Sequence, residues 1–377
     1  MQKINLFSPL ELRDLHLKNR IVLSPMCQYK AINGHIQDWH LAHHSRFALG
    51  GLALAFIEAT GVTPEGRITY GCTGIWDDSH MDGLKKIVKL YKSQNTAVGI
   101  QLGHAGRKGS CVRLTDGGQP IANDDQNEPP WKTLGPSDIP ERKGYPVPKS
   151  MSHKEIIEVI EAFKNAAKRA LVAGFDTIEI HGAHGYLIHS FFSPISNNRK
   201  DQFGGNLKRR MTLPLMVTEA IREIWPNNKP LFYRVSCVDY IKGGIPIEET
   251  TQLAKELKLH GVHVIDCSSG GMSSPTSKPQ TKYFRGFQVP YAEKIKNLSD
   301  LKTMAVGLIT DPEQAEMILK NNQADLIALA REMISDSNWA FRAAHQLKVD
   351  NPYSVLPHSY GFFLKQRAES LNVSNID

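Results

Sequence analysis

The sequence predicts an α/β fold, a single (β/α)8 TIM barrel spanning residues 1–377, with a long lid loop after the third strand. Eight apolar segments rich in β-branched residues recur along the chain, and stretches with helical spacing of apolar residues separate most of them. The segments are nearly continuous apolar runs, which is typical of parallel strands buried on both faces. The length of 377 residues suits a barrel of about 250 residues plus insertions. A doubly wound sheet is the alternative, but no Gly-x-Gly-x-x-Gly fingerprint follows the first strand.

The first half of the chain gives three strands and one clear helix. Residues 79–94 are predicted to be helical because apolar side chains from Met81 to Tyr91 recur on one face. The connection after the first strand is less clear. Residues 105–150 are rich in Pro, Gly and Asp, and a loop this long is typical of a functional lid or a mobile segment. The eight expected strands cover residues 21–23, 52–62, 97–102, 176–180, 231–235, 262–266, 304–308 and 324–330.

The second half alternates more regularly. Ser152 and Glu155 form a capping box ahead of a helix that ends near Gly174. Asp311-Pro312 is typical of a helix start, as is Pro246. Residues 348–377 are predicted to be a C-terminal tail. The other helices are expected around residues 209–224, 246–259 and 338–347.

Composition excludes several classes of protein. Hydrophobic residues make up 41% and charged residues 22% of the chain, as in soluble globular proteins. No apolar run approaches the ~20 residues that span a bilayer, and the first residues lack the apolar core of a signal peptide. The five cysteines are far apart and lack the spacing of zinc or iron–sulfur sites, so a reducing cytoplasm is expected. The net charge of +7 is scattered, which favours a solvated surface over a nucleic-acid-binding face.

The stretch His181-Gly182-Ala183-His184-Gly185-Tyr186 follows the fourth expected strand. Its imidazoles can donate hydrogen bonds to a substrate oxygen at neutral pH, and its phenol can deliver a proton. The small residues between them let a flat ligand approach the backbone. Two other interpretations are a zinc pair, which lacks a third ligand, and a turn with two hydrogen-bonded histidines.

Polar residues also follow the other strands, and in a barrel these ends face the active site. Gln101 can both donate and accept, as the polar edge of a heterocycle requires, and Arg234 could stabilise a negatively charged ring. Alternatively, Gln101 and Arg234 pair with each other inside the barrel. Strands seven and eight end at Gly307 and at Ala330-Arg331, where barrels commonly bind phosphate. Together these residues suggest a flavin mononucleotide (FMN) site.

In these motifs and strand-end residues the chain resembles the Old Yellow Enzyme family of FMN-dependent ene-reductases, in particular its thermophilic-like bacterial branch. The resemblance runs from Phe7 to about Ser337. Several independent motifs occur in the family's order: Asn19-Arg20-Ile21-Val22, Ser24-Pro25-Met26-Cys27, Gln101-Leu102-Gly103-His104-Ala105-Gly106-Arg107, His181-Gly182-Ala183-His184-Gly185-Tyr186-Leu187 and Gly307-Leu308-Ile309-Thr310-Asp311.

The resemblance implies a role for each matching residue. His181 and His184 would bind the carbonyl or nitro oxygen of an electron-poor alkene, Tyr29 would contact the substrate, and Tyr186 would be the proton donor. Cys27 would lie near the flavin and tune its potential, whereas a buried small hydrophobic role is the alternative. The cofactor-binding set would be Ser24, Pro25, Met26, Cys27, Ala59, Gln101 and Arg234 at the ring, and Gly307, Ala330 and Arg331 at the phosphate.

The resemblance also implies a ping-pong reaction in which NADPH, with NADH as the alternative reductant, delivers hydride through FMN to the β carbon while Tyr186 protonates the α carbon. The thermophilic-like relatives place a C-terminal arginine in the neighbouring subunit's active site. Here residues 356–361 contain no arginine, so a homo-oligomer of that kind is left open.

Two other classes of function fit parts of the sequence. A tRNA dihydrouridine synthase would suit the basic charge, but it needs an RNA-binding surface that the sequence does not indicate. A non-enzymatic flavin-binding protein would leave the two histidines and Tyr186 without a role.

Overall fold

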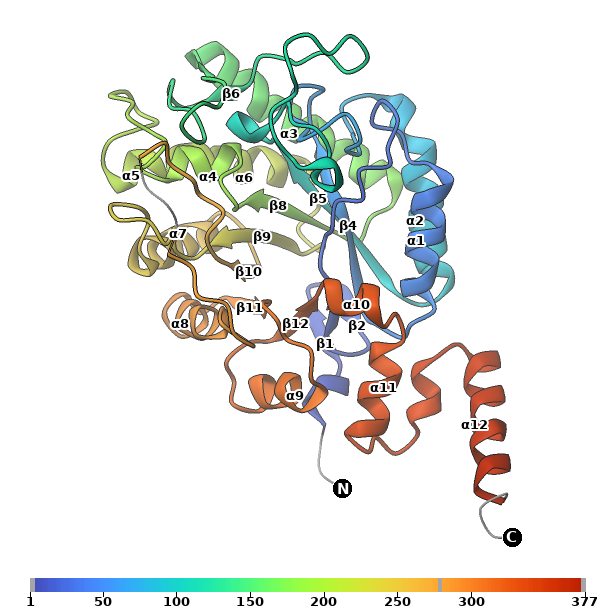
Figure 1. Cartoon of the computed structure of the whole chain (residues 1–377). Helices are drawn as coiled ribbons and strands as arrows, with labels where there is room; N and C mark the ends of the chain where they lie inside the picture. Colours follow the sequence, from blue (N-terminus) through green and yellow to red (C-terminus); the bar gives the residue numbers. More distant parts are fainter. Residues whose placement is uncertain (1–3, 277–279, 374–377) are drawn as a thin grey trace.

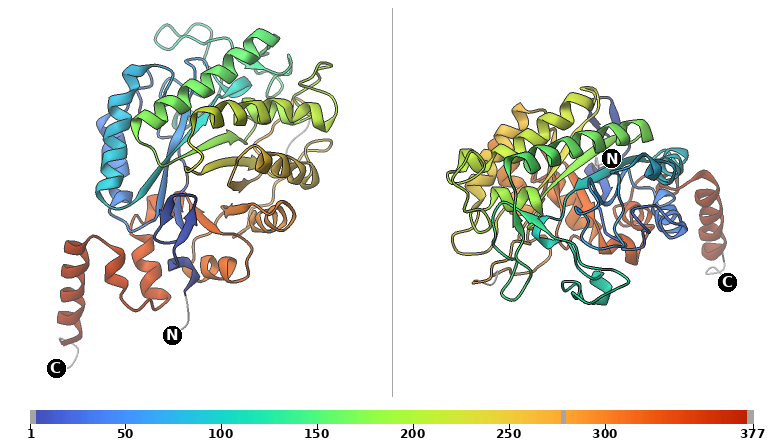
Figure 2. Two further views of the ribbon diagram at one scale, coloured as in Figure 1. Left: turned by 180° about the vertical axis from the view of Figure 1, so that it is seen from behind. Right: turned by 90° about the horizontal axis from the view of Figure 1, so that it is seen from above.

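The computed structural model describes residues 4–276 and 280–373 and has a closed barrel of eight strands at its centre. Every strand pairs in parallel with its neighbours, in the order β10-β11-β12-β3-β4-β5-β8-β9. Helices surround the barrel, as Figures 1 and 2 show. The predicted (β/α)8 fold is therefore confirmed. The barrel strands are β3 (Ile21–Leu23), β4 (Leu54–Gly61), β5 (Ala97–Gly103), β8 (Thr177–Gly182), β9 (Leu231–Ser236), β10 (Val264–Ser268), β11 (Lys302–Ala305) and β12 (Leu326–Leu329).

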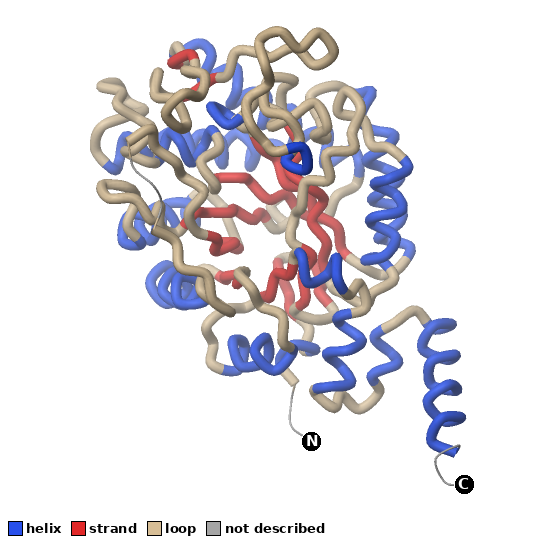
Figure 3. Tube along the Cα trace, viewed as in Figure 1, coloured by secondary structure: helices blue, strands red, loops and turns tan. Residues whose placement is uncertain are grey.

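The helices form the outer layer, shown in blue in Figure 3. The capping box at Ser152 and Glu155 is present, with the Ser152 hydroxyl accepting from Glu155 N–H at 3.3 Å, and Gly174 ends the helix with φ +91°. The helices are α1 (Asp38–Ala48), α2 (Met81–Ser93), α3 (His153–Ala173), α4 (Leu187–Phe192), α5 (Leu207–Arg210), α6 (Thr212–Ile224), α7 (Ile247–Leu259), α8 (Val289–Ser299), α9 (Pro312–Lys320), α10 (Arg331–Ser335), α11 (Trp339–Gln346) and α12 (His358–Val373).

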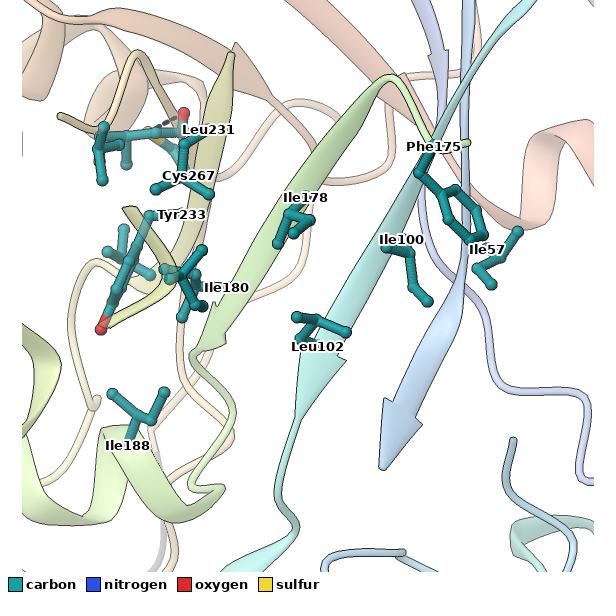
Figure 4. Close-up of a cluster of buried hydrophobic side chains, with 14 of the residues drawn as sticks. Ile57, Ile100, Leu102, Phe175, Ile178, Ile180, Ile188, Leu231, Tyr233 and Cys267 are labelled. Carbon is teal, nitrogen blue, oxygen red and sulfur yellow. Dashed lines mark hydrogen bonds between the residues drawn. The ribbon is translucent and has the colours of Figure 1, made fainter. Parts of the chain in front are cut away.

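Strand alternation divides the side chains between two environments. Ile100, Ile178, Ile180 and Leu231 point outward into the apolar layer beneath the helices, where Figure 4 shows them packed together. The intervening residues point into the barrel. Inside the barrel, the half nearer the N-terminal ends of the strands is filled by a second apolar cluster. It includes Phe56 and Phe232, whose ring centroids are 5.2 Å apart.

A two-stranded hairpin, β1 (Leu10–Leu12) and β2 (Leu15–Leu17), packs its leucines against that lower cluster. The hairpin covers the N-terminal end of the barrel strands. The opposite, C-terminal end of the strands is the end at which barrel active sites form.

Three local expectations need correction. Strand six covers Val264–Ser268 rather than residues 262–266, and strand seven covers Lys302–Ala305 rather than residues 304–308. The seventh strand ends early because Gly307 and Leu308 both take left-handed backbone angles, φ +121° and +52°. The tail after residue 348 contains the helix α12, which stands away from the barrel (Figure 1).

The segment from residue 105 to residue 150 follows β5 and contains only short regular elements, among them β6 (Leu134–Gly135) and β7 (Lys149–Ser150). Buried Arg107 joins it to the loop after β10, donating to the carbonyls of Pro140 at 3.1 Å and Ser273 at 2.7 Å. Its role as a lid stays a prediction. No helix in the described part of the chain is long and apolar enough to cross a membrane.

Candidate active site

The histidine–tyrosine motif lies where β8 passes into α4, at the C-terminal end of the barrel. The His181 ring lies between its two partners, with centroids 5.2 Å from His184 and 4.9 Å from Tyr186. His184 and Gly185 have φ values of +60° and +76°, which turn the chain sharply between the strand and the helix. The three side chains predicted to act together therefore do lie together.

Both imidazoles are neutral at pH 7. Burial lowers the pKa of His181 and of His184 well below the ordinary value, and the nearby Arg234 cation lowers them further. His184 Nε2 lies 2.7 Å from Ser268 Oγ, whereas buried His181 Nδ1 has no hydrogen-bond partner among the described residues. A buried ring nitrogen without a partner is available to a ligand.

The Tyr186 hydroxyl is held in its protonated form, because burial raises its pKa well above the ordinary value. The Lys108 Nζ atom lies 5.4 Å from the centre of the Tyr186 ring, and it donates to the carbonyls of His184 and Gly271 at 3.0 Å each. Lys108 thus fixes the backbone on one side of the phenol. Sequence reasoning missed this residue, although it directly follows the Gln101–Arg107 motif.

The loop after β3 brings Cys27 and Tyr29 to the same end of the barrel. The carboxylate of Glu58, within β4, accepts the backbone N–H of Gln28, which lies between Cys27 and Tyr29. Glu58 is itself 3.1 Å from His40 Nε2, and both side chains are buried. Tyr29 takes φ +55°, an uncommon angle for a tyrosine, which this anchoring holds in place. Burial raises the pKa of the Cys27 thiol well above its usual value, so it is not a thiolate nucleophile at neutral pH.

Gln101 and Arg234 lie inside the barrel, but they do not pair with each other as one interpretation of the sequence allowed. Gln101 Nε2 donates to Glu179 at 2.8 Å, and Arg234 Nε lies 3.2 Å from Asp266. Arg234 also donates to Ser24 Oγ at 3.2 Å. The two carboxyl groups are the partners that sequence reasoning missed. A charged residue within an apolar strand was the signal, because strand alternation places Glu179 and Asp266 on the interior face.

The ends of β11 and β12 carry the residues predicted to bind phosphate. A Cβ atom at Gly307 would lie 2.8 Å from the buried Gln288 amide, so this position has no room for a side chain unless Gln288 moves. Ala330 is the last residue before α10, which begins at Arg331. The register pairs β12 with both β11 and β3, so this end lies beside Ser24.

A pocket at the C-terminal end joins several of these elements. It is lined by residues at or just after the C-terminal ends of β4, β5 and β8, including Ala59, His104, His181 and Tyr186. Within the described residues there is no group of three or more His, Cys, Asp or Glu side chains placed to hold a metal ion.

Comparison with known proteins decides the family. A model of the NADH:flavin oxidoreductase / NADH oxidase family matches residues 5–350. This chain belongs to that family. It is 42% identical over 346 residues to an NADPH dehydrogenase of Geobacillus thermodenitrificans, covering 91% of this chain and 95% of the relative. It is 41% identical over 352 residues to an NADPH dehydrogenase of Bacillus subtilis, covering 93% and 97%.

Solved structures share the fold. An old yellow enzyme homologue from Zymomonas mobilis superposes with a TM-score of 0.74 at 22% identity, covering 91% of this chain and 93% of that one. Morphinone reductase in complex with tetrahydroNAD superposes with a TM-score of 0.72 at 24% identity, covering 90% of each chain. The predicted membership of the Old Yellow Enzyme family is confirmed, and the protein is a flavin-dependent oxidoreductase.

The family implies FMN, and the residues present suit it. The Arg234 guanidinium lies at the barrel mouth with its Nε lacking a well-aligned hydrogen bond, as a cation facing an electron-rich ring would. Gly307 takes φ +121° and has Gln288 beside it, so the turn after β11 requires a residue without a side chain. The interior thus offers a cation at Arg234 and an amide at Gln101, which suit the ring of FMN, and the residues expected to bind its phosphate, Gly307 and Arg331, follow β11 and β12.

Proposed function

We propose that this protein uses FMN and NADPH to reduce the activated C=C bond of α,β-unsaturated carbonyl or nitro compounds. The convergence of His181, His184 and Tyr186 beside the barrel mouth carries this proposal. FMN, when bound, supplies hydride-transfer chemistry, with NADPH as the source of the hydride and NADH as the alternative source. The proposed ligands of FMN are Ser24, Pro25, Met26, Cys27, Ala59, Gln101, Arg234, Gly307, Ala330 and Arg331.

The two neutral imidazoles suit a carbonyl or nitro oxygen. Each ring can donate one N–H, and two donors on one oxygen withdraw electrons from the conjugated double bond. Because His181 is buried and His184 is partly buried, these hydrogen bonds would be stronger than in water. Binding of the oxygen would therefore activate the alkene and fix its orientation in the same step.

Tyr186 is suited to protonating the other carbon of the double bond. A phenol with a raised pKa keeps its proton until negative charge develops nearby, which is the behaviour of a general acid in the transition state. Tyr29, which reaches this end of the barrel on the anchored β3 loop, is proposed to contact the substrate.

The names of the relatives favour this function over the tRNA dihydrouridine synthase alternative. Both relatives are NADPH dehydrogenases, and this chain covers more than nine-tenths of each. The proposed substrates are small electron-poor alkenes rather than nucleic acid.

The identity of the cofactor tests the foundation of the proposal. The purified protein is expected to be yellow and to release FMN, not FAD, when it is denatured and the supernatant is separated by chromatography.

Replacing Gly307 by Ala places a methyl group against Gln288 at a left-handed backbone angle, so this variant should retain less FMN than the wild type. A colourless protein that does not take up added FMN would contradict the proposal.

A further inference from the structure

A buried histidine and a buried aspartate lie behind the His184–Tyr186 loop and are not part of the proposed reaction. His189 is on α4 and Asp239 is on the loop after β9, beside which α4 lies (Figure 1). Their side chains are fully buried, and His189 Nε2 is 2.9 Å from Asp239 Oδ1. On its other side, His189 Nδ1 accepts the backbone N–H of Gly185 at 2.8 Å. The pair is thus attached to the peptide between His184 and Tyr186.

The hydrogen bond from Gly185 fixes the tautomer of His189. A backbone N–H is always a donor, so Nδ1 carries no proton and the ring proton is on Nε2, which is in close contact with Asp239 Oδ1 at 2.9 Å but not aligned with it as a hydrogen bond. Asp239 Oδ2 accepts from Ser193 Oγ at 2.6 Å and from Ile245 N at 2.9 Å. Burial alone would raise the pKa of Asp239, but the His189 ring and these two donors outweigh it and lower the pKa, so the carboxyl is ionised.

The loop between β8 and α4, which His189 contacts at Gly185, has a strained backbone. His184 takes φ +60°, which is unfavourable for a residue with a side chain, and Gly185 follows with φ +76°. Gly271 packs so closely that a Cβ atom there would lie 2.4 Å from His184 Cα. A small shift of Gly185 would therefore move both flanking side chains together.

We propose that His189 and Asp239 are positioning residues, which hold the Gly185 peptide so that His184 and Tyr186 meet the substrate in reactive geometry. The inference rests on the proposed function, because it assigns His184 and Tyr186 to substrate binding and proton transfer. A displacement of about 1 Å at reacting groups commonly costs about 10²-fold in rate.

Three replacements of His189 separate positioning from packing. In His189→Asn the side-chain oxygen can occupy the place of Nδ1 and still accept from Gly185 N–H. In His189→Gln the longer amide can reach Asp239 but leaves Gly185 without its acceptor, and His189→Leu removes both contacts. His44, which is buried against Tyr91 at 2.7 Å between α1 and α2, provides the matched control His44→Leu.

Asp239→Asn provides an isosteric test should His189→Leu fail to fold. The amide oxygen must face Ile245 N–H, because two N–H groups repel each other, so the amide NH2 faces His189. His189 must then accept at Nε2 and carry its proton on Nδ1, pointing at the Gly185 N–H. Asp239→Asn therefore keeps the shape of the site, but the Gly185 N–H loses His189 Nδ1 as its hydrogen-bond acceptor.

The experiment measures the rate of alkene reduction by the NADPH-reduced holoenzyme, the rate of flavin reduction by NADPH, and hydrogen exchange of the peptide covering residues 181–192. His189→Gln, His189→Leu and Asp239→Asn are expected to slow alkene reduction at least ~10-fold and to exchange faster in this peptide, while flavin reduction changes less. His189→Asn should keep alkene reduction within about threefold of wild type, and His44→Leu should change only the melting temperature.

Equal rates of alkene reduction in wild type, His189→Leu and Asp239→Asn would overturn the proposal, as would equal losses in His189→Asn and His189→Leu. If the wild type reduces no alkene, the proposed function fails. The exchange rates of the 181–192 peptide still test the positioning role in that case, because they do not depend on the reaction.

Discussion

Tyr186→Phe is expected to slow alkene reduction by about 10² or more for enones, because a positioned general acid is typically worth about 10²–10⁴ in rate. That range corresponds to ~3–5 kcal/mol of barrier. The substitution keeps the ring that packs against His181 and removes only the hydroxyl. Stopped-flow measurement of the two half-reactions checks the expectation, since reduction of the flavin by NADPH needs no proton from Tyr186 and should keep its rate.

Nitroalkenes provide an internal control for this variant. A nitronate is stable without immediate protonation, so the hydride step should suffer less with a nitroalkene than with an enone. Tyr29→Phe is a second control, because Tyr29 is placed as a substrate contact and not as an acid. Wild-type enone reduction by Tyr186→Phe would show that the proton comes from solvent or another residue.

The double variant His181→Ala with His184→Ala is expected to abolish binding of simple phenols over the flavin, seen as loss of the long-wavelength charge-transfer band. The neutral rings supply the two donors for the ligand oxygen, and hydrogen bonds in a buried site are each worth about 1–3 kcal/mol when one partner is removed. Loss of both corresponds to an affinity loss of the order of 10² or more. Titration of the wild-type and variant holoenzymes with a phenol, followed by the charge-transfer absorbance, measures this loss of affinity.

A matched deletion of two histidines outside the site is available on α1. His43→Ala with His44→Ala removes neighbouring rings that pack against Phe47 and Tyr91, and this variant should retain the band. An unchanged band in the His181 and His184 variant, with FMN still bound, would mean that the two histidines have a purely structural role.

The sequence predicted the barrel because its strands are apolar on the outer face and its helices carry regular caps. Ser152, Glu155 and Gly174 are local signals, and they depend on a few neighbouring residues only. The end of β11 was misplaced because Leu308 looks like a strand residue, whereas its left-handed angle follows from the turn at Gly307. The helix α12 was missed because residues 348–377 show little amphipathic pattern.

The site was predictable where the chemistry is local in sequence. His181, His184 and Tyr186 lie within six residues of each other at the end of one strand. Because barrel active sites form at the C-terminal ends of the strands, their proximity could be predicted from the sequence. The partners of these residues could not be found in the same way. Asp239 and His189 are fifty residues apart in the chain, and the link between Glu58 and Gln28 joins β4 to the loop after β3. Such contacts depend on barrel closure and helix packing, which no single stretch of sequence encodes.

The central claim is that the reduced enzyme transfers its electrons to an activated alkene, and an anaerobic single turnover tests it most directly. The holoenzyme is reduced with one equivalent of NADPH, and 2-cyclohexenone is then added while the flavin absorbance is followed and cyclohexanone is quantified by gas chromatography. The account predicts that the oxidised flavin spectrum returns and that one equivalent of cyclohexanone forms. A flavin that stays reduced with 2-cyclohexenone, a maleimide and a nitroalkene, yet is reoxidised when oxygen is admitted, would contradict it.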